Sequence, residues 1–357
     1  MEPIIAQVLQ DFGFQPEGAE ARPFGSGLIH HTWRLKAGGG DYILQEVNDK
    51  VFRNPPDIAH NIRIVGNFLT HRLPDAVFPL PILTAQKEEY SRAGGSWFRL
   101  VPFVAGTHTV DTCDAPAQAF EAARQFGQFT ANLDGLRMDM LRHTIPGFHD
   151  LSFRFRQFQE ALEQGDPERK AASADGIDFL LRHGHIAERY EQLRHDPAFV
   201  QRVTHHDTKI SNVLLDEQEK GVCVIDLDTV MPGYFISDLG DMMRTYLSPA
   251  SEEEKDFDRM SIRQDNYEAI VEGYALPLAG QLTQAEKKSL FYSGEFMIYM
   301  QALRFLTDHL NMDRYYGAAY PGHNFVRGMN QVVLLDKYLA SKDALEKAAA
   351  RITNSGF

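Results

Sequence analysis

One short stretch of the sequence, residues 203 to 241, gathers acids, an amide and a lysine whose types suit phosphoryl transfer to an alcohol. Asp207, Lys209 and Asn212 stand just before one apolar run, and Asp226 ends the next. Transfer to a hydroxyl requires a carboxylate to accept the proton, oxygen ligands for magnesium and a cation for the phosphate charge. Asp207 suits the first role and Lys209 the third. Asn212 and Asp226 suit the second.

Two short strands must position these groups. The apolar runs 213–215 and 222–225 flank the polar turn 217–221, a pattern that predicts a two-stranded ribbon. Pairing would bring the polar ends of both strands to one edge. A polar hairpin of solvated acids is the alternative, but Asp226 and Asp228 stand among core-type residues, where an unpaired carboxylate would be costly.

The spacing HxDxxxxN over residues 205–212, followed by a strand that ends in Asp226, resembles the catalytic and metal loops of the aminoglycoside phosphotransferase family. This family is the small-molecule branch of the protein-kinase fold. The resemblance implies that Asp207 is the base, that Asn212 and Asp226 bind Mg²⁺, and that ATP is the donor. Asp238 resembles the family residue that braces the catalytic loop, although a helix cap is a competing interpretation.

A glycine turn near the N-terminus leads into a predicted hairpin over residues 24–45. In the family the corresponding loop covers the nucleotide phosphates, because glycine lets backbone amides approach an anion. A simple turn would explain the glycine loop without a nucleotide, and an apolar edge strand would explain the expected hinge at Pro102, Phe103 and Val104. With the hinge that follows the small lobe, the resemblance implies nucleotide contacts at Gly25, Ser26, Gly27, Leu28, Thr32, Gln45, Pro102, Phe103 and Val104.

Gln45 is a departure from the family pattern. Kinase-like folds carry a lysine on the strand after the glycine loop, paired with a glutamate of the next helix. Here the strand offers Gln45, and the helix predicted from Asn54 contains no glutamate. Losing both partners avoids leaving one charge buried alone. We therefore expect Gln45 to make neutral hydrogen bonds and Lys209 to carry more of the phosphate charge.

Composition excludes several classes of protein. The 357 residues are 43% hydrophobic and carry a formal net charge of -13, which argues against a nucleic-acid or anionic-membrane partner. No apolar run approaches the length of a membrane helix, and no export signal is visible, so we expect a cytoplasmic protein. Cys113 and Cys223 lack the spacing of a zinc site.

The patterns predict a bilobal α+β architecture, and the family resemblance implies the protein-kinase-like fold, with a small antiparallel-sheet lobe over residues 1–103 and a mostly helical lobe over 104–357. A first helix is expected over 1–14 and a last one over 324–340. The acidic run 251–258 is expected to be solvated and receives no function.

Within the family, residues 225–233 and the pair Thr208-Lys209 look most like the N-acetylhexosamine 1-kinases, which implies a sugar 1-phosphate product. A kinase for choline or homoserine is the alternative, but a cationic substrate needs acids or an aromatic cage. Arg304 and Arg314 among the nearby acids favour a neutral sugar. A catalytically inactive nucleotide-binding module is a third possibility. Such a module would be expected to lose Asp207 or Asp226, and both are present. The expected sugar contacts are His31, His149, Arg304 and Tyr315.

Overall fold

The structure, a computed structural model, describes residues 2–25 and 29–354. The chain forms two compact units. Unit 1 comprises Met1–His108, Gly135–Pro146 and Ile225–Met231, and unit 2 comprises Thr109–Asp134, Gly147–Val224 and Pro232–Phe357. The predicted division lies at a single chain position, between residues 103 and 104. It therefore assigns the two later segments of unit 1 to the second lobe.

Asn61 shows why those segments belong to unit 1. Its fully buried side chain donates to the carbonyl oxygens of Arg142 at 2.8 Å and Val230 at 2.9 Å. Its carboxamide oxygen accepts from the backbone N–H of Arg142 at 2.9 Å. One amide thus satisfies backbone groups of both later segments, and contacts over 81 and 169 residues leave no local signal in a sequence.

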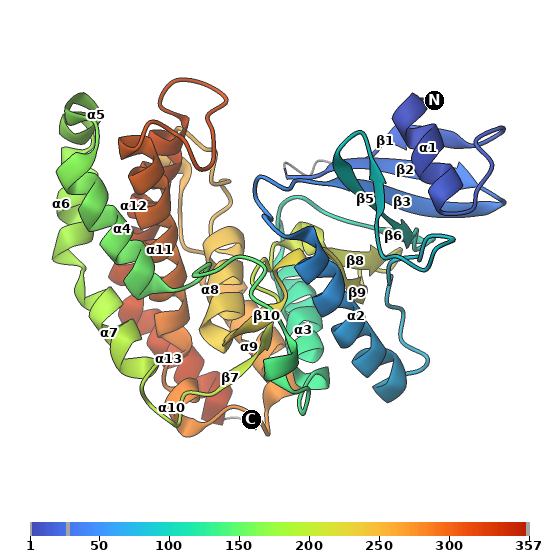
Figure 1. Cartoon of the computed structure of the whole chain (residues 1–357). Coiled ribbons are helices and arrows are strands. Elements are labelled where there is room, and N and C mark those ends of the chain that lie inside the picture. The colour runs from blue at the N-terminus through green and yellow to red at the C-terminus, as the bar shows by residue number, and fades with distance from the viewer. Residues whose placement is uncertain (1, 26–28, 355–357) are drawn as a thin grey trace. The chain divides into compact units, whose positions relative to one another are not determined.

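The predicted antiparallel sheet is the centre of unit 1 (Figure 1). Its strand order is β1-β2-β3-β5-β4. Gly38 and Gly39, both at positive φ, form the tight turn between the second and third strands. Five strands make this sheet, and β6 follows: β1 Glu20–Pro23, β2 His31–Ala37, β3 Gly40–Val47, β4 Ser91–Ala93, β5 Ser96–Pro102 and β6 Thr107–His108.

Two helices accompany the sheet in unit 1. Helix α1 (Pro3–Asp11) buries Ile5, Val8 and Leu9 in the core that the sheet supplies. It begins within the predicted range and ends at Asp11. Helix α2 (Pro55–Arg72) starts directly after Asn54, as predicted, with two prolines in its first turn.

Helices dominate unit 2, as predicted from residue 111 onward. Their bounds are α3 Pro116–Asn132, α4 Leu151–Gln164, α5 Pro167–Ala172, α6 Ala174–Arg182, α7 His185–Leu193, α8 Phe235–Tyr246, α9 Gln264–Ala275, α10 Gln284–Lys287, α11 Leu290–Leu310, α12 His323–Ala340 and α13 Lys342–Asn354. The prediction that α12 ends the fold is wrong, because α13 follows it and buries Leu345, Ala348 and Ile352.

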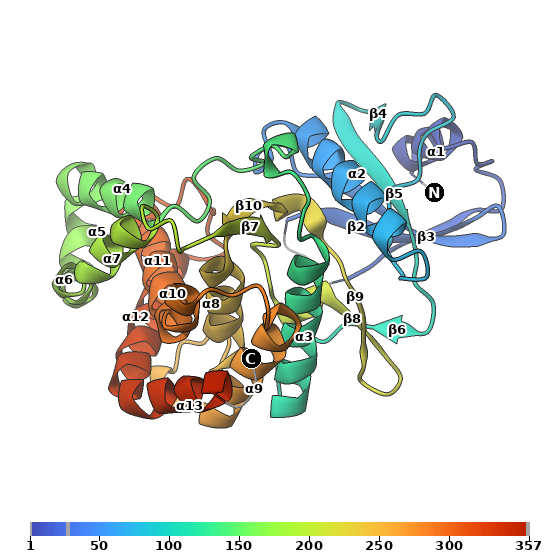
Figure 2. The same cartoon turned by 90° about the horizontal axis from the view of Figure 1, so that it is seen from below.

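Helix α11 is the central element of unit 2. It contacts α12, α8 and α4, and Figure 2 shows it within this group of helices. Nearly all of its 21 residues are buried, so it is enclosed on every side rather than on one face. No helix among the described residues has the length and apolar character needed to cross a membrane.

Four short strands carry the loops of the predicted catalytic stretch: β7 Gln201–Thr204, β8 Val213–Asp216, β9 Gly221–Val224 and β10 Met231–Tyr234. The predicted ribbon is confirmed, because β8 and β9 pair antiparallel with Val213 opposite Val224. Asn212 and Ile225 consequently leave the ribbon at the same end.

Candidate active site

The loop from His205 to Asn212 is held in place by an acid of helix α8. Asp238 accepts the backbone N–H of His205 at 3.0 Å and of His206 at 2.8 Å, one on each carboxylate oxygen. Both bonds lie in the interior, where Asp238 is fully buried. His206 adopts a positive φ of 68°, which side chains rarely tolerate unless their surroundings fix it. Asp238 therefore braces the loop, as its resemblance implied.

Three predicted residues meet on this loop around the carboxylate of Asp207. Asn212 donates from its carboxamide nitrogen to the carbonyl oxygen of Asp207 at 2.9 Å and to its carboxylate at 3.1 Å. The ammonium of Lys209 lies 3.4 Å from the other carboxylate oxygen, and the negative charge of Asp207 raises the pKa of Lys209. The carboxylate is partly exposed, as a base that meets a substrate must be.

A chain of buried and partly buried ion pairs supports the loop. Asp241 accepts the backbone N–H of Thr208 at 2.8 Å and pairs with Arg244 at 2.9 Å. Arg244 also pairs with Glu252, which in turn pairs with Arg327 of α12. Burial alone would raise the pKa of Glu252, but the two arginines hold it well below its usual range. The prediction that residues 251–258 are merely solvated is wrong for Glu252.

A second buried network lies in unit 1 around Gln45. The carboxamide oxygen of Gln45 accepts from Arg99 Nε at 2.9 Å, and its nitrogen donates to Thr32 at 3.4 Å. The bond to Thr32 is neutral, as expected of Gln45, whereas the bond from Arg99 comes from a charged guanidinium that the sequence prediction did not include. Arg99 forms an ion pair with Asp228, whose other oxygen lies 2.9 Å from His30 Nε2. Burial would lower the pKa of Arg99, but Asp228 raises it above its ordinary value.

The sequence prediction missed Arg99, Asp228 and His30. An arginine inside the apolar strand Trp97-Phe98-Arg99-Leu100-Val101 is unusual, and so is the second acid of Ile225-Asp226-Leu227-Asp228. Taken together, the two would have suggested a buried ion pair.

Asp226 follows β9 by two residues and adopts a left-handed conformation, with φ 60° and ψ 61°. A non-glycine residue held there is strained, and such residues often mark functional sites. Its carboxylate, that of Asp228 and the ring of His30 bring possible metal-ligand atoms within 4.8 Å of one another. Because Arg99 and His30 already engage both oxygens of Asp228, Asp226 is the acid better suited to a cation.

The predicted nucleotide contacts in unit 1 fall into two groups. Gly25 has φ 80°, a conformation that favours glycine, whereas Ser26, Gly27 and Leu28 lie outside the described residues. At the predicted hinge, Pro102 ends β5 and the N–H of Phe103 donates to Asp41 at 3.0 Å. The carbonyl of Val104 accepts from Thr107 at 2.7 Å. The N–H of Phe103 is thus already engaged within unit 1.

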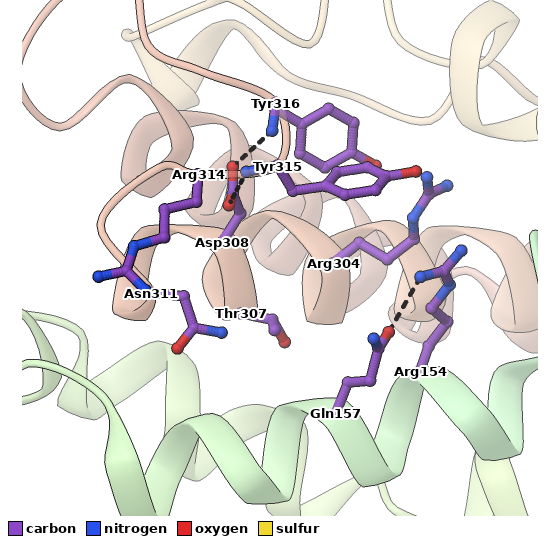
Figure 3. A pocket seen from close by; sticks show the side chains of 9 residues that line it. All are labelled: Arg154, Gln157, Arg304, Thr307, Asp308, Asn311, Arg314, Tyr315 and Tyr316. Atoms are coloured by element: carbon purple, nitrogen blue, oxygen red, sulfur yellow. Dashed lines mark hydrogen bonds between the residues drawn. The ribbon is translucent and has the colours of Figure 1, made fainter. Parts of the chain in front are cut away.

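Unit 2 contains a cavity of about 390 Å³ between α4, α11 and the loop that follows α11 (Figure 3). Its volume is that of a small-molecule site. Arg304 and Tyr315, two predicted sugar contacts, line this cavity. The lining is Arg154, Gln157, Arg304, Thr307, Asp308, Asn311, Arg314, Tyr315 and Tyr316. Sequence analysis left Arg154 and Gln157 unassigned, because α4 and α11 are brought together only by folding.

The other two predicted sugar contacts do not line this cavity. His31 belongs to β2 in unit 1, where its ring lies 3.0 Å from the carboxylate of Glu46. His149 is buried in unit 2 and lies 3.2 Å from the ring of His206. Burial and the neighbouring His206 hold the pKa of His149 well below its ordinary value, which favours the neutral ring.

A row of stacked side chains connects the braced loop with the cavity inside unit 2. His206 contacts His149, and the ring of His149 stacks on Phe148 with centroids 4.3 Å apart. The guanidinium of Arg304 lies 5.0 Å from the centre of the Phe148 ring. Close-packed rings compress little, so the row fixes the cavity relative to the loop that carries Asp207.

The fold and the loop chemistry define a small-molecule phosphotransferase with a protein-kinase-like fold, made of a small antiparallel sheet and a larger helical region. The Phosphotransferase enzyme family, APH, matches residues 20–268, and the chain belongs to this family. The family and the fold predicted from the sequence are thereby confirmed.

Solved structures share this fold over nearly the whole chain. An aminoglycoside phosphotransferase from Alicyclobacillus acidocaldarius is 17% identical, covers 98% of each chain and has a TM-score of 0.63. A spectinomycin phosphotransferase in complex with ADP and spectinomycin is 15% identical over 96% of this chain and 99% of that one, with a TM-score of 0.61. A microcompartment-associated aminopropanol kinase is 18% identical over 95% and 97%, also with 0.61. At these identities the likeness is one of fold.

Proposed function

We propose that this phosphotransferase moves the γ-phosphate of ATP to the anomeric hydroxyl of an N-acetylhexosamine and so produces the sugar 1-phosphate. Asp207 accepts the proton of the attacking hydroxyl, and Lys209 balances phosphate charge. ATP as the donor is supported by the similar spectinomycin phosphotransferase, whose structure contains ADP. Asp207 itself lies within reach of Lys209 and Asn212.

Magnesium is the metal that this donor set suits. The nitrogen of Asn212 is engaged by Asp207, which leaves its carboxamide oxygen for a hard cation. Asp226 supplies a carboxylate. Magnesium bound by these two residues would neutralise phosphate charge during transfer.

The observation that carries the sugar acceptor is the lining of the cavity in unit 2. It contains arginines, tyrosines, amides and a threonine, all of which hydrogen-bond hydroxyl groups. Asp308 is the one acid in this lining. Its two carboxylate oxygens accept the backbone N–H groups of Tyr315 at 2.7 Å and Tyr316 at 2.8 Å. A cationic amino alcohol would find no free carboxylate there, so the kinase for choline or homoserine is the less supported function.

Phosphorus NMR of the product tests this proposal. With N-acetylglucosamine or N-acetylgalactosamine as the acceptor, the product phosphorus should couple to the anomeric proton. The methyl glycoside should inhibit without being phosphorylated, because its anomeric oxygen carries no proton for Asp207 to accept. A 6-phosphate product, turnover of the methyl glycoside, or activity only with choline or homoserine would contradict it.

A further inference from the structure

The cavity of unit 2 carries more positive charge than a neutral sugar requires. Three arginines and one acid line it. The acid, Asp308, accepts two backbone N–H groups and a third bond, from Asn324 Nδ2 at 3.1 Å. These bonds hold the loop after α11, and no ion pair joins Asp308 to the arginines among the described residues. The carboxylate of Asp308 therefore stabilises the loop and does not neutralise the arginines of the cavity.

Arg304 is one of two buried cations among these arginines. Its side chain projects from α11 into the cavity, and the residue is only 7% exposed (Figure 3). One terminal nitrogen donates to Gln301 at 3.2 Å, whereas Nε is buried without a hydrogen-bond partner among the described residues. A buried guanidinium with an unsatisfied N–H and no counter-ion is costly unless a ligand completes it.

Arg154 presents a second such cation from α4. It donates to Gln157 at 2.9 Å and, with two nitrogens, to the carbonyl oxygen of Phe148 at 3.3 Å. All of these acceptors are neutral, and no carboxylate pairs with Arg154 in the described part of the chain. Burial and the nearby guanidinium of Arg304 lower the pKa of Arg154 to about 10.

Figure 3 shows the guanidinium groups of Arg154 and Arg304 at the same end of the cavity, with Arg314 at the opposite end beside Asn311. Two like charges that face the same cavity repel each other. An anion between them would remove this repulsion, and guanidinium groups match the planar oxygens of a phosphate or a carboxylate.

We propose that this end of the cavity binds an oxyanion, a phosphate or a carboxylate, that the sugar carries away from its anomeric carbon. The inference rests on one part of the proposed function, namely that the acceptor is a sugar. It narrows the preferred acceptor to an N-acetylhexosamine that also carries a phosphate or carboxylate group and whose anomeric hydroxyl is free. Neutral hydroxyl groups would satisfy Arg304 Nε but would leave both charges without a counter-ion.

Calorimetry on the intact chain, saturated with ADP and magnesium to fill the nucleotide site, tests the proposal. The ligands are N-acetylglucosamine, its 6-phosphate and the corresponding 6-carboxylate. At least one anionic sugar should bind about tenfold more tightly than the neutral one. Preference for the phosphate or for the carboxylate identifies the group. Equal affinities for all three sugars would overturn the proposal.

Arg154→Gln should abolish this preference, because it removes one of the two cations. Arg156→Gln is the matched control, since Arg156 lies on the same helix but is exposed, and it should keep the preference. A preference that survives in Arg154→Gln would place the anion elsewhere and overturn the proposal. If Arg154→Gln fails to fold, the comparison of the three sugars on the wild-type chain still decides.

Inorganic phosphate should bind more weakly than the sugar 6-phosphate, because it lacks the sugar contacts. Equal affinities would assign the cations to free phosphate and overturn the acceptor assignment. Binding is measured here without turnover, so it is independent of the NMR test. Turnover of neutral N-acetylhexosamine with no anion preference would refute only this inference, and anion preference with no 1-phosphate would refute only the proposed function.

Discussion

Arg99 lies directly opposite Gln45 in the antiparallel pair of β3 and β5, and its Nε donates to the Gln45 carboxamide at 2.9 Å. The sequence analysis assigns Gln45 to the position where kinase-like folds carry a lysine, which pairs with a glutamate on the next helix. In this chain a buried cation and a buried acid are also paired, but they come from other elements. The cation comes from the neighbouring strand β5 and the acid, Asp228, comes from the segment after β9. The buried pair thereby ties β5 to the segment that also carries Asp226.

Removing this cation should destabilise unit 1. Arg99→Gln leaves the carboxylate of Asp228 buried beside His30 alone, and breaking a buried ion pair typically costs about 3–5 kcal/mol. Both tryptophans of the chain, Trp33 and Trp97, lie in unit 1. Tryptophan fluorescence during urea unfolding therefore reports on this unit, and its midpoint should fall clearly.

Two further variants serve as controls for the change in the unfolding midpoint. Arg99→Lys keeps the charge and should recover part of the loss. Arg22→Gln removes an exposed arginine paired with Glu20 on β1 and should cost less than about 1 kcal/mol. An unchanged midpoint in Arg99→Gln would show that the Arg99–Asp228 pair does not stabilise unit 1.

Local patterns predicted the parts of the site that are close in sequence. Asp207, Lys209 and Asn212 lie within six residues, so their spacing alone brings them together once the loop is braced. The ribbon of β8 and β9 followed from two apolar runs and a polar turn, because hairpin pairing is also local.

Contacts made across long stretches of chain could not be predicted in this way. Glu252 looked like part of a solvated acidic run because its partners, Arg244 and Arg327, stand 8 and 75 residues away. Arg154 faces Arg304 only because α4 packs on α11. Single-sequence patterns report which residues prefer burial, but the identity of a distant partner depends on the folded arrangement.

The proposed base gives a second prediction. Asp207→Asn retains the shape of the side chain but cannot accept the hydroxyl proton, so the turnover number should fall by about a hundredfold or more. Affinity for ADP, measured by calorimetry, should change little, and Asp175→Asn on the exposed face of α6 should leave both unchanged. Near-normal turnover in Asp207→Asn would remove Asp207 from the role of base.

Magnesium gives a third prediction. Activity should disappear when EDTA removes the metal and return when magnesium is added. Asp226→Asn removes the charge, and asparagine tolerates the left-handed conformation that Asp226 adopts better than most residues do. This variant should therefore bind ADP with the same weak affinity with and without magnesium. A normal magnesium-dependent gain in affinity would mean that the metal is held by other residues.

The buried brace of the catalytic loop gives a pH dependence of stability. Burial raises the pKa of Asp238 from an ordinary value of 3.8 to about 6. The folded chain thus holds this proton more tightly than the unfolded chain. The stability that Asp238 contributes is complete below about pH 3.8 and is lost as the pH rises through about 6. The whole change corresponds to about 3 kcal/mol, of which about 2 kcal/mol falls between pH 4.5 and 7.5.

Asp238→Asn cannot titrate and isolates this contribution. Helix content, followed by circular dichroism during urea unfolding, reports mainly on unit 2, where most helices lie. The free energy of unfolding of the wild type minus that of Asp238→Asn should fall by about 2 kcal/mol from pH 4.5 to pH 7.5. Other titrating groups affect both proteins alike and cancel in the difference. A difference that stays constant with pH, or grows, would show that the carboxyl of Asp238 does not titrate near pH 6 in the folded chain.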